Sequence, residues 1–174
     1  NAATGVILYQ VLRRQQLAIA LGYVAVRIFE AAIIAVGTCC LLAIVTLREE
    51  GVAGADEASL TAVGSALVAV RDWTFVFGPG LCSGLGNGLL LGYLMFRSGL
   101  VPRNMALLGV IGGPLSLIGV TFVIFGQWEQ DAPQQFLFTI AEIAWELSLS
   151  VYLIVWGFRA VPLASELDRE PSPV

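Results

Sequence analysis

Four long runs of apolar residues constrain the fold of this chain more than any other feature. They cover residues 17–47, 73–96, 105–126 and 136–158. A helix needs about 20 apolar residues to cross the roughly 30 Å of hydrocarbon in a bilayer. Because the strands of a membrane barrel are about half that length and alternate in polarity, these runs predict helices. A shorter apolar segment, residues 3–12, is expected to be the end of a truncated preceding span.

The composition points to lipid as the solvent. Of the 174 residues, 57% are hydrophobic and only 13% are charged, whereas soluble domains carry about 25% charged residues. In water so few charges would leave large apolar patches exposed, and a bilayer removes that conflict. We therefore predict an all-α polytopic integral membrane bundle with one transmembrane domain, residues 1–159. A disordered cytoplasmic tail is expected over residues 160–174.

The arginines predict the orientation of the bundle. Six of the nine lie in one set of connections, namely Arg13, Arg14, Arg97, Arg103, Arg159 and Arg169. The alternate connections, residues 48–58 and 127–133, carry six acidic residues and one arginine. Basic residues concentrate on the cytoplasmic side of membranes, so the C-terminus is expected in the cytoplasm. The absence of lysine beside abundant Ala, Gly and Val favours a bacterial plasma membrane.

Residues 56–71 show a weaker, amphipathic pattern. Apolar side chains recur there at helical spacing, with polar residues on the other faces. The segment is either a helix on the outer surface or an outward extension of the second span. Arg71 and Asp72 follow it, either as solvated interfacial charges or as the outer vestibule of an intramembrane site. The run Gly78-Pro79-Gly80 then predicts a kink near the outer interface.

Glycines are spaced regularly along the second span. Gly80, Gly84, Gly88 and Gly92 are each four residues apart, and Gly113 lies in a similar glycine-rich stretch of the third span. Such a stripe allows another helix to approach closely. The partner is either a helix of the same chain or, alternatively, a second copy or another membrane subunit.

Charged residues inside the spans are the candidate functional residues. Arg27 and Glu30 share a helix face in the first span, and Glu142 and Glu146 share a face in the fourth. Ionisable groups within membranes face the bundle interior and pair with one another, so we expect the two pairs to meet at mid-depth. The cluster is either structural, or a transport or proton-linked site, or part of a lipid pocket or a catalytic centre.

Several functions lack a signal in the sequence. There is no histidine, which is the commonest metal ligand and the usual acid–base residue near neutral pH. Cys39, Cys40 and Cys82 lie in apolar runs without a metal-binding spacing. The sequence also lacks the stripe of basic residues that is typical of nucleic-acid-binding proteins. We therefore expect no metal, no cofactor, no nucleic-acid partner and no catalytic residue.

The block from Gly92 to Arg103, Gly-Tyr-Leu-Met-Phe-Arg-Ser-Gly-Leu-Val-Pro-Arg, resembles the bacterial DUF4386 domain family of integral membrane proteins. Residues 8–13, residues 26–31 and the run from Glu146 to Gly157 also fit that family. The resemblance implies a protein of six or seven spans with no established activity, and it transfers no catalytic residue. Where the family tends to have His-Asp before an aromatic residue, this chain has Arg71-Asp72-Trp73.

Three functional hypotheses arise from these patterns. The first is a structural or accessory membrane subunit packed through its glycine-rich helix faces, with membrane lipids and a second copy or another subunit as partners. The second is a small transporter or proton-linked carrier that uses the Arg–Glu cluster. The third is a lipid-binding protein or a membrane-embedded enzyme.

Overall fold

The computed structural model describes residues 1–50 and 55–159, and all its regular elements in these ranges are helical. They are α1 (Ala2–Leu12), α2 (Leu17–Glu50), α3 (Glu57–Phe75), η1 (Val76–Cys82), η2 (Gly84–Leu91), α4 (Gly92–Ser98), α5 (Arg103–Ile124) and α6 (Pro133–Val155). The elements η1 and η2 are π-helical. The predicted all-α class is confirmed, while the tail expected over residues 160–174 lies outside the described residues.

Among the described residues, four helical segments are long and apolar enough to cross a bilayer, as predicted from the apolar runs. They are Leu17–Glu49, Glu57–Ser98, Arg103–Ile124 and Pro133–Val155. The first helix, Ala2–Leu12, is apolar but shorter. The second of the four is longer than expected, since the amphipathic segment of residues 56–71 continues directly into it. The segment is thus continuous with the second span, and its position relative to the outer surface of the membrane stays a prediction.

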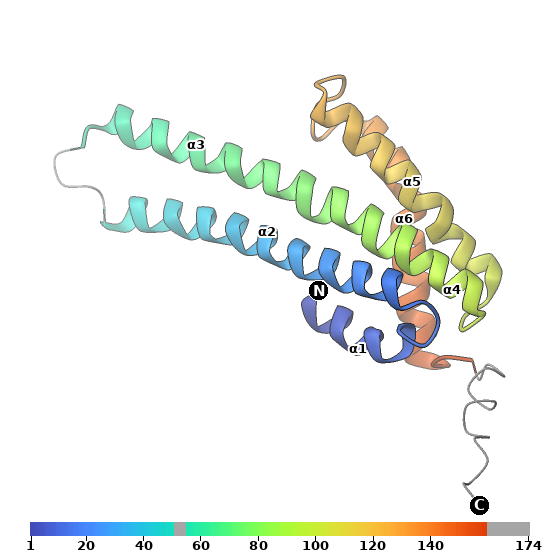
Figure 1. Ribbon diagram of the computed structural model, residues 1–174. Helices are drawn as coiled ribbons and strands as arrows, with labels where there is room; N and C mark the ends of the chain where they lie inside the picture. Colours follow the sequence, from blue (N-terminus) through green and yellow to red (C-terminus); the bar gives the residue numbers. More distant parts are fainter. Residues whose placement is uncertain (51–54, 160–174) are drawn as a thin grey trace, which may run out of the picture.

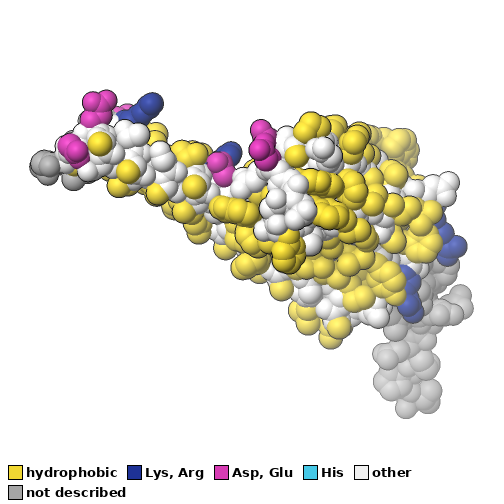
Figure 2. Space-filling view, turned by 90° about the horizontal axis from the view of Figure 1, so that it is seen from above, with side chains coloured by type: hydrophobic (Ala, Val, Ile, Leu, Met, Phe, Trp, Pro, Cys, Tyr) yellow, Lys and Arg dark blue, Asp and Glu magenta, His cyan; other side chains and the backbone are white. Residues whose placement is uncertain are grey.

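The helices α2 and α3 form a long hairpin whose connected ends stand clear of α5 and α6 (Figure 1). We call this projecting part, residues 38–49 and 57–70, the arm. The segment Glu57–Ser98 has 42 residues, or about 63 Å at helical rise, against about 30 Å of hydrocarbon. No residue of α3 is buried. Figure 2 shows acidic side chains near the end of the arm and hydrophobic ones over much of the bundle.

Local chemistry accounts for several helix ends. The side chain of Asp56 accepts a hydrogen bond of 3.2 Å from the backbone N–H of Ser59, which caps α3. This bond holds the pKa of the exposed Asp56 carboxyl below its usual value. Gly99 ends α4 with a φ of 69°, a left-handed conformation that glycine adopts without strain. The tight turn it allows brings α5 back alongside α4 and η2.

The π-helical stretch begins at the position where the sequence predicted a kink, the run Gly78-Pro79-Gly80. Pro79 lies inside η1 and has no N–H to donate to the α-helical ladder. The next π-helical element, η2, contains three glycines in the sequence Gly-Leu-Gly-Asn-Gly-Leu-Leu-Leu. Because glycine has no side chain, these positions do not oppose a change of helical register. π-helical turns are rare, occur mostly as single turns inside α-helices, and are frequent at functional sites. The polar side chains of this longer stretch are therefore candidates for a functional site.

The connections divide into two ends of the bundle. Arg159 donates its backbone N–H to the carbonyl of Leu100 at 2.9 Å, which joins the end of α6 to the α4–α5 turn. Leu12, the last residue of α1, belongs to the same buried cluster as Leu100 and Val101. We call this the arginine end, because Arg13, Arg14, Arg97, Arg103 and Arg159 all lie at these connections. The α5–α6 loop lies at the opposite end of those two helices.

Candidate functional site

Arg27 and Glu30 form a buried ion pair within α2. The Arg27 Nη1 lies 2.6 Å from the Glu30 Oε2, and the two residues are only 5% and 4% exposed. Asn1 closes the arrangement: Arg27 Nη2 donates to its Oδ1 at 2.8 Å, and its Nδ2 donates to Glu30 Oε1 at 2.9 Å. The helical spacing of three residues that suggested this pair therefore corresponds to a direct contact.

Glu146 is held by two donors from the π-helical stretch. Asn87 Nδ2 donates to the Glu146 Oε1 at 2.6 Å, and the Ser83 hydroxyl donates to the same oxygen. Hydrogen bonds to an ionised acceptor are among the stronger ones in proteins. Nothing in the sequence pointed to Ser83 or Asn87 as partners, because the contact joins residues about 60 positions apart and depends on the tertiary fold.

Glu142 is the residue of the group that lacks partners. It is 2% exposed, and neither carboxylate oxygen has a hydrogen-bond partner in the described part of the chain. Its surroundings are glycine backbone: a β-carbon on Gly112 would lie 2.6 Å from the Glu142 nitrogen, and one on Gly88 would overlap the Glu142 Oε2. A buried carboxylate without partners is costly, so Glu142 requires a proton, a cation or a ligand nearby.

Other buried polar atoms in the two described ranges also lack partners. Besides Glu142, they include the Tyr23 hydroxyl and the Arg27 Nε. Tyr23 is four residues before Arg27 and shares its helix face. Buried polar groups in proteins are nearly always hydrogen-bonded, so unsatisfied ones indicate water, an ion or a ligand. The interior of the bundle therefore contains donors and acceptors that can still bind a water molecule, an ion or a ligand.

The structure arranges the four predicted residues as two groups on either side of η2. A β-carbon on Gly86 would lie 3.8 Å from the Arg27 Cδ, so the Arg27 side chain packs against η2. The next residue, Asn87, reaches Glu146 of α6 on the other side. No hydrogen bond or ion pair joins Arg27 to either glutamate of α6 within residues 1–50 and 55–159. The joint action of the two groups stays a prediction.

Arg71 and Asp72 pair with each other on the surface. Their Nη1 and Oδ1 lie 3.0 Å apart, and the side chains are 42% and 41% exposed. Arg71 also lines a cleft of about 210 Å³ between α2 and α3, together with Gly37 and Thr74. Neither Arg27 nor a glutamate of the polar groups is among the described residues that line this cleft. The role of these two residues as an outer vestibule remains a prediction.

The glycine stripe packs inside the chain against α5. A β-carbon on Gly84 would lie 3.1 Å from the Gly113 oxygen, and one on Gly92 would lie 3.0 Å from the Gly109 carbonyl carbon. At the far end of the stripe, one on Gly80 would meet the Val120 side chain at 3.1 Å. In this structure the glycine faces of η2 and α5 are therefore filled by each other, as the internal-packing interpretation expects.

These findings define the class of protein. In the described part of the chain, four apolar helices of spanning length enclose buried ionisable side chains, which makes this chain an integral membrane protein with several spans. Comparison with known families then gives the particular one. The family model described as "Domain of unknown function (DUF4386)" matches residues 1–157, and the chain belongs to that family. No curated protein and no solved structure matches the chain.

Proposed function

We propose that this chain is a small proton-linked membrane carrier in which Glu142 binds and releases the proton. One observation carries the proposal: a carboxylate deep inside a membrane bundle is buried without a hydrogen-bond partner in the described residues. A carboxyl group in that position is uncharged when it holds a proton and requires another partner when it does not. It can therefore couple the occupancy of a site to the movement of a proton.

The surroundings of Glu142 support this role. Glu146 lies one helical turn further along α6 and is fixed by Asn87 and Ser83. A second carboxylate close by makes the charge of the site depend on both groups. The donors come from a glycine- and proline-rich π-helical stretch, and interrupted helices at mid-membrane are typical of transporter binding sites. We further propose that the arginine end faces the cytoplasm of a bacterial cell.

Infrared difference spectroscopy tests the proposal. The protein is placed in lipid nanodiscs and moved between acidic and alkaline buffer, and the carbonyl stretch of protonated carboxyl groups is recorded. We expect a band that disappears at alkaline pH, shifts in deuterated water and is missing in Glu142→Gln. Glu129→Gln, a change at an exposed glutamate of the α5–α6 loop, is the matched control and should retain the band.

Two results would refute the carrier proposal. A Glu142 band that neither titrates nor shifts in deuterated water would make the residue a permanently neutral hydrogen-bond donor. An identical spectrum for the wild type and Glu142→Gln would mean that Glu142 does not take up a proton. In either case the polar groups would be a structural element of the bundle.

A structural or accessory membrane subunit is the second candidate, and the arm is the observation that favours it. The residues of α3 are all at least partly exposed, and Val63, Val68 and Val70 are strongly so. Such a face suits contact with another membrane subunit or a second copy. Mass measurement in nanodiscs of defined size distinguishes the candidates, since a monomer that purifies without a partner would count against the subunit role.

A further inference from the structure

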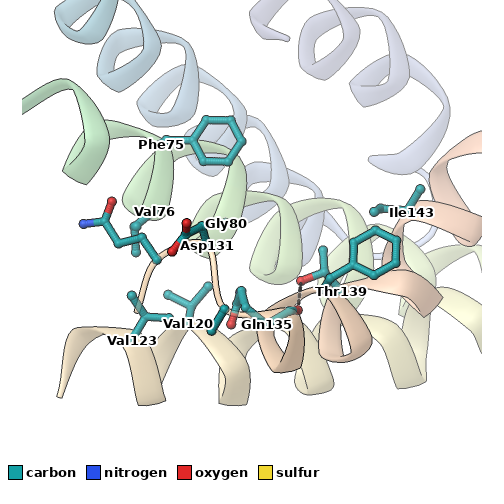
Figure 3. Close-up of a pocket in the computed structure, with 12 residues that line it drawn as sticks. Phe75, Val76, Gly80, Val120, Val123, Asp131, Gln135, Thr139 and Ile143 are labelled. Carbon is teal, nitrogen blue, oxygen red and sulfur yellow. Dashed lines mark hydrogen bonds between the residues drawn. The ribbon is translucent and has the colours of Figure 1, made fainter. Parts of the chain in front are cut away.

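A second cavity lies between η1, α5 and α6, at the end of α5 and α6 away from the arginine end (Figure 3). Its volume is about 310 Å³. Val76, Val120 and Val123 supply much of its apolar wall, and none of Arg27, Glu30, Glu142 and Glu146 is among the described residues that line it. The cavity is therefore separate from the polar groups of the proposed carrier, and a ligand could bind in it whether or not Glu142 exchanges a proton.

The polar side chains around this cavity include three with hydrogen-bond acceptors, beside Gln130, whose side-chain amide can also donate. Gln135 Oε1 is buried and has no partner in the described part of the chain. The Thr139 hydroxyl donates to the backbone carbonyl of Gln135 at 2.8 Å, the bond drawn in Figure 3. Because its hydrogen is used in this bond, the hydroxyl can only accept a hydrogen bond from a ligand. The carboxylate of Asp131 is a third acceptor. A ligand that satisfies these groups must bring hydrogen-bond donors.

The charges and the apolar side chains at the edge of the cavity indicate which class of ligand it can bind. The connecting loop, residues 126–132, carries Glu129 and Asp131 and no basic residue. Phe75 and Phe136 also line the cavity and are 60% and 59% exposed. The cavity therefore has an acidic edge at the loop and an apolar edge where lipid chains would lie. Anionic headgroups would be repelled at the acidic edge, and a cation would be attracted.

We propose that this cavity binds amphipathic cations, with alkylammonium ions as the simplest members of the class. The hydrocarbon chain lies among Val120, Val123 and Phe136, where it is removed from water or exchanges with lipid chains. The ammonium group donates to the carboxylate of Asp131 at the acidic edge of the cavity. Such a ligand complements the negative charge of the loop, whereas the carboxylate of a fatty acid would be repelled by it.

Fluorescence quenching provides the test, because Trp128 packs against the Val76, Val120 and Val123 cluster beside the cavity. The full chain in nanodiscs of zwitterionic lipid is titrated with a bromoalkylammonium ion and, separately, with a bromoalkanoate of equal chain length. We expect saturable quenching by the ammonium ion and much weaker quenching by the carboxylate. In Trp128→Phe the saturable component should disappear.

Two matched variants separate binding in the cavity from general attraction. Asp131→Asn should weaken the ammonium affinity by roughly fivefold, as expected for loss of one partly exposed ion pair. Glu129→Gln removes an equal charge from the same loop, but Glu129 is not among the described lining residues, and it should change the affinity by less than about twofold.

Three outcomes would overturn the proposal. Equal quenching by the ammonium ion and the carboxylate would assign the cavity to bulk lipid chains. Equal losses in Asp131→Asn and Glu129→Gln would indicate a diffuse surface attraction. Unchanged saturable quenching in Trp128→Phe would place the bound ion elsewhere on the protein.

Discussion

The indole Nε1 of Trp145 donates a hydrogen bond of 2.8 Å to the backbone carbonyl of Asn87, across the contact between α6 and η2. The Asn87 side chain donates in the opposite direction, to Glu146, the residue that follows Trp145. Trp145 is fully buried and packs against Gly109 of α5. This reciprocal pair of bonds fixes the π-helical stretch relative to the helix that carries both glutamates.

Replacing Trp145 with Phe should loosen this contact. The variant keeps an aromatic ring but removes the donor to the Asn87 carbonyl, and we expect a loss of stability of about 1–2 kcal/mol. Unfolding by a chaotropic detergent mixture, followed by circular dichroism, measures the loss. Replacing the exposed Trp156 with Phe is the matched control. Equal stability of the two variants would argue against the bond as a fixed element of the bundle.

Gly88→Ala should be strongly destabilising, whereas Gly64→Ala should not be. A β-carbon on Gly88 would overlap the Glu142 Oε2 and the Gly113 Cα, while one on Gly64 in the arm would meet nothing within 4 Å. Overpacking typically costs about 1–3 kcal/mol. Replacing an exposed helical glycine with alanine stabilises a helix by about 0.5–1 kcal/mol. Thermal unfolding of both variants in the same detergent checks the contrast, and a tolerated Gly88→Ala would contradict the close contact.

The buried pair in α2 should show strong coupling. Arg27→Met leaves the Glu30 carboxylate without its ionic partner, and Glu30→Gln leaves the guanidinium without its counter-charge, so each should cost about 3 kcal/mol or more. The double variant removes both charges and should be less destabilised than the sum of the two. A double-mutant cycle of unfolding free energies measures the coupling. Additive effects would mean that the two side chains do not depend on each other.

The cap of α3 should make the arm sensitive to acid. Because the hydrogen bond from Ser59 lowers the folded-state pKa of Asp56, its stabilising effect is complete above the ordinary value of 3.8. The effect is lost as the pH falls through the lower folded-state value. The protection factor of the Ser59 amide, meaning its exchange rate relative to that of an unstructured peptide at the same pH, should therefore fall below about pH 4 in the wild type. Asp56→Asn retains a capping side chain without a titrating charge, and its cap should lack this pH dependence.

The sequence predicted the spans well because their signal is local. Runs of apolar residues specify helices of membrane length whatever their neighbours are. Each of the four helical segments contains or overlaps one of those runs, although the second, Glu57–Ser98, begins well before its run. The spacing of Arg27 and Glu30 likewise indicated a shared face on one helix. That face carries the ion pair in the structure, since a contact between residues three apart needs no knowledge of the tertiary fold.

The partners of the α6 glutamates could not be predicted in the same way. Ser83 and Asn87 meet Glu146 because the stretch that carries them packs against α6 in the tertiary fold. Helical periodicity assumes regular α-helical turns, so it does not give the direction of side chains from this stretch. The isolation of Glu142 depends on glycines from two other elements, Gly88 and Gly112, which the sequence shows only as a packing stripe.

Labelling with a hydrophobic carbodiimide, which reacts inside membranes with protonated carboxyl groups, tests the central claim most directly. The protein in native lipid is treated over a range of pH, digested and analysed by mass spectrometry. We predict that Glu142 is the principal intramembrane carboxyl labelled, and that its labelling falls as the pH rises because the proton is released. The absence of label on Glu142 at every pH, or a yield that does not change with pH, would contradict an exchangeable proton at this site.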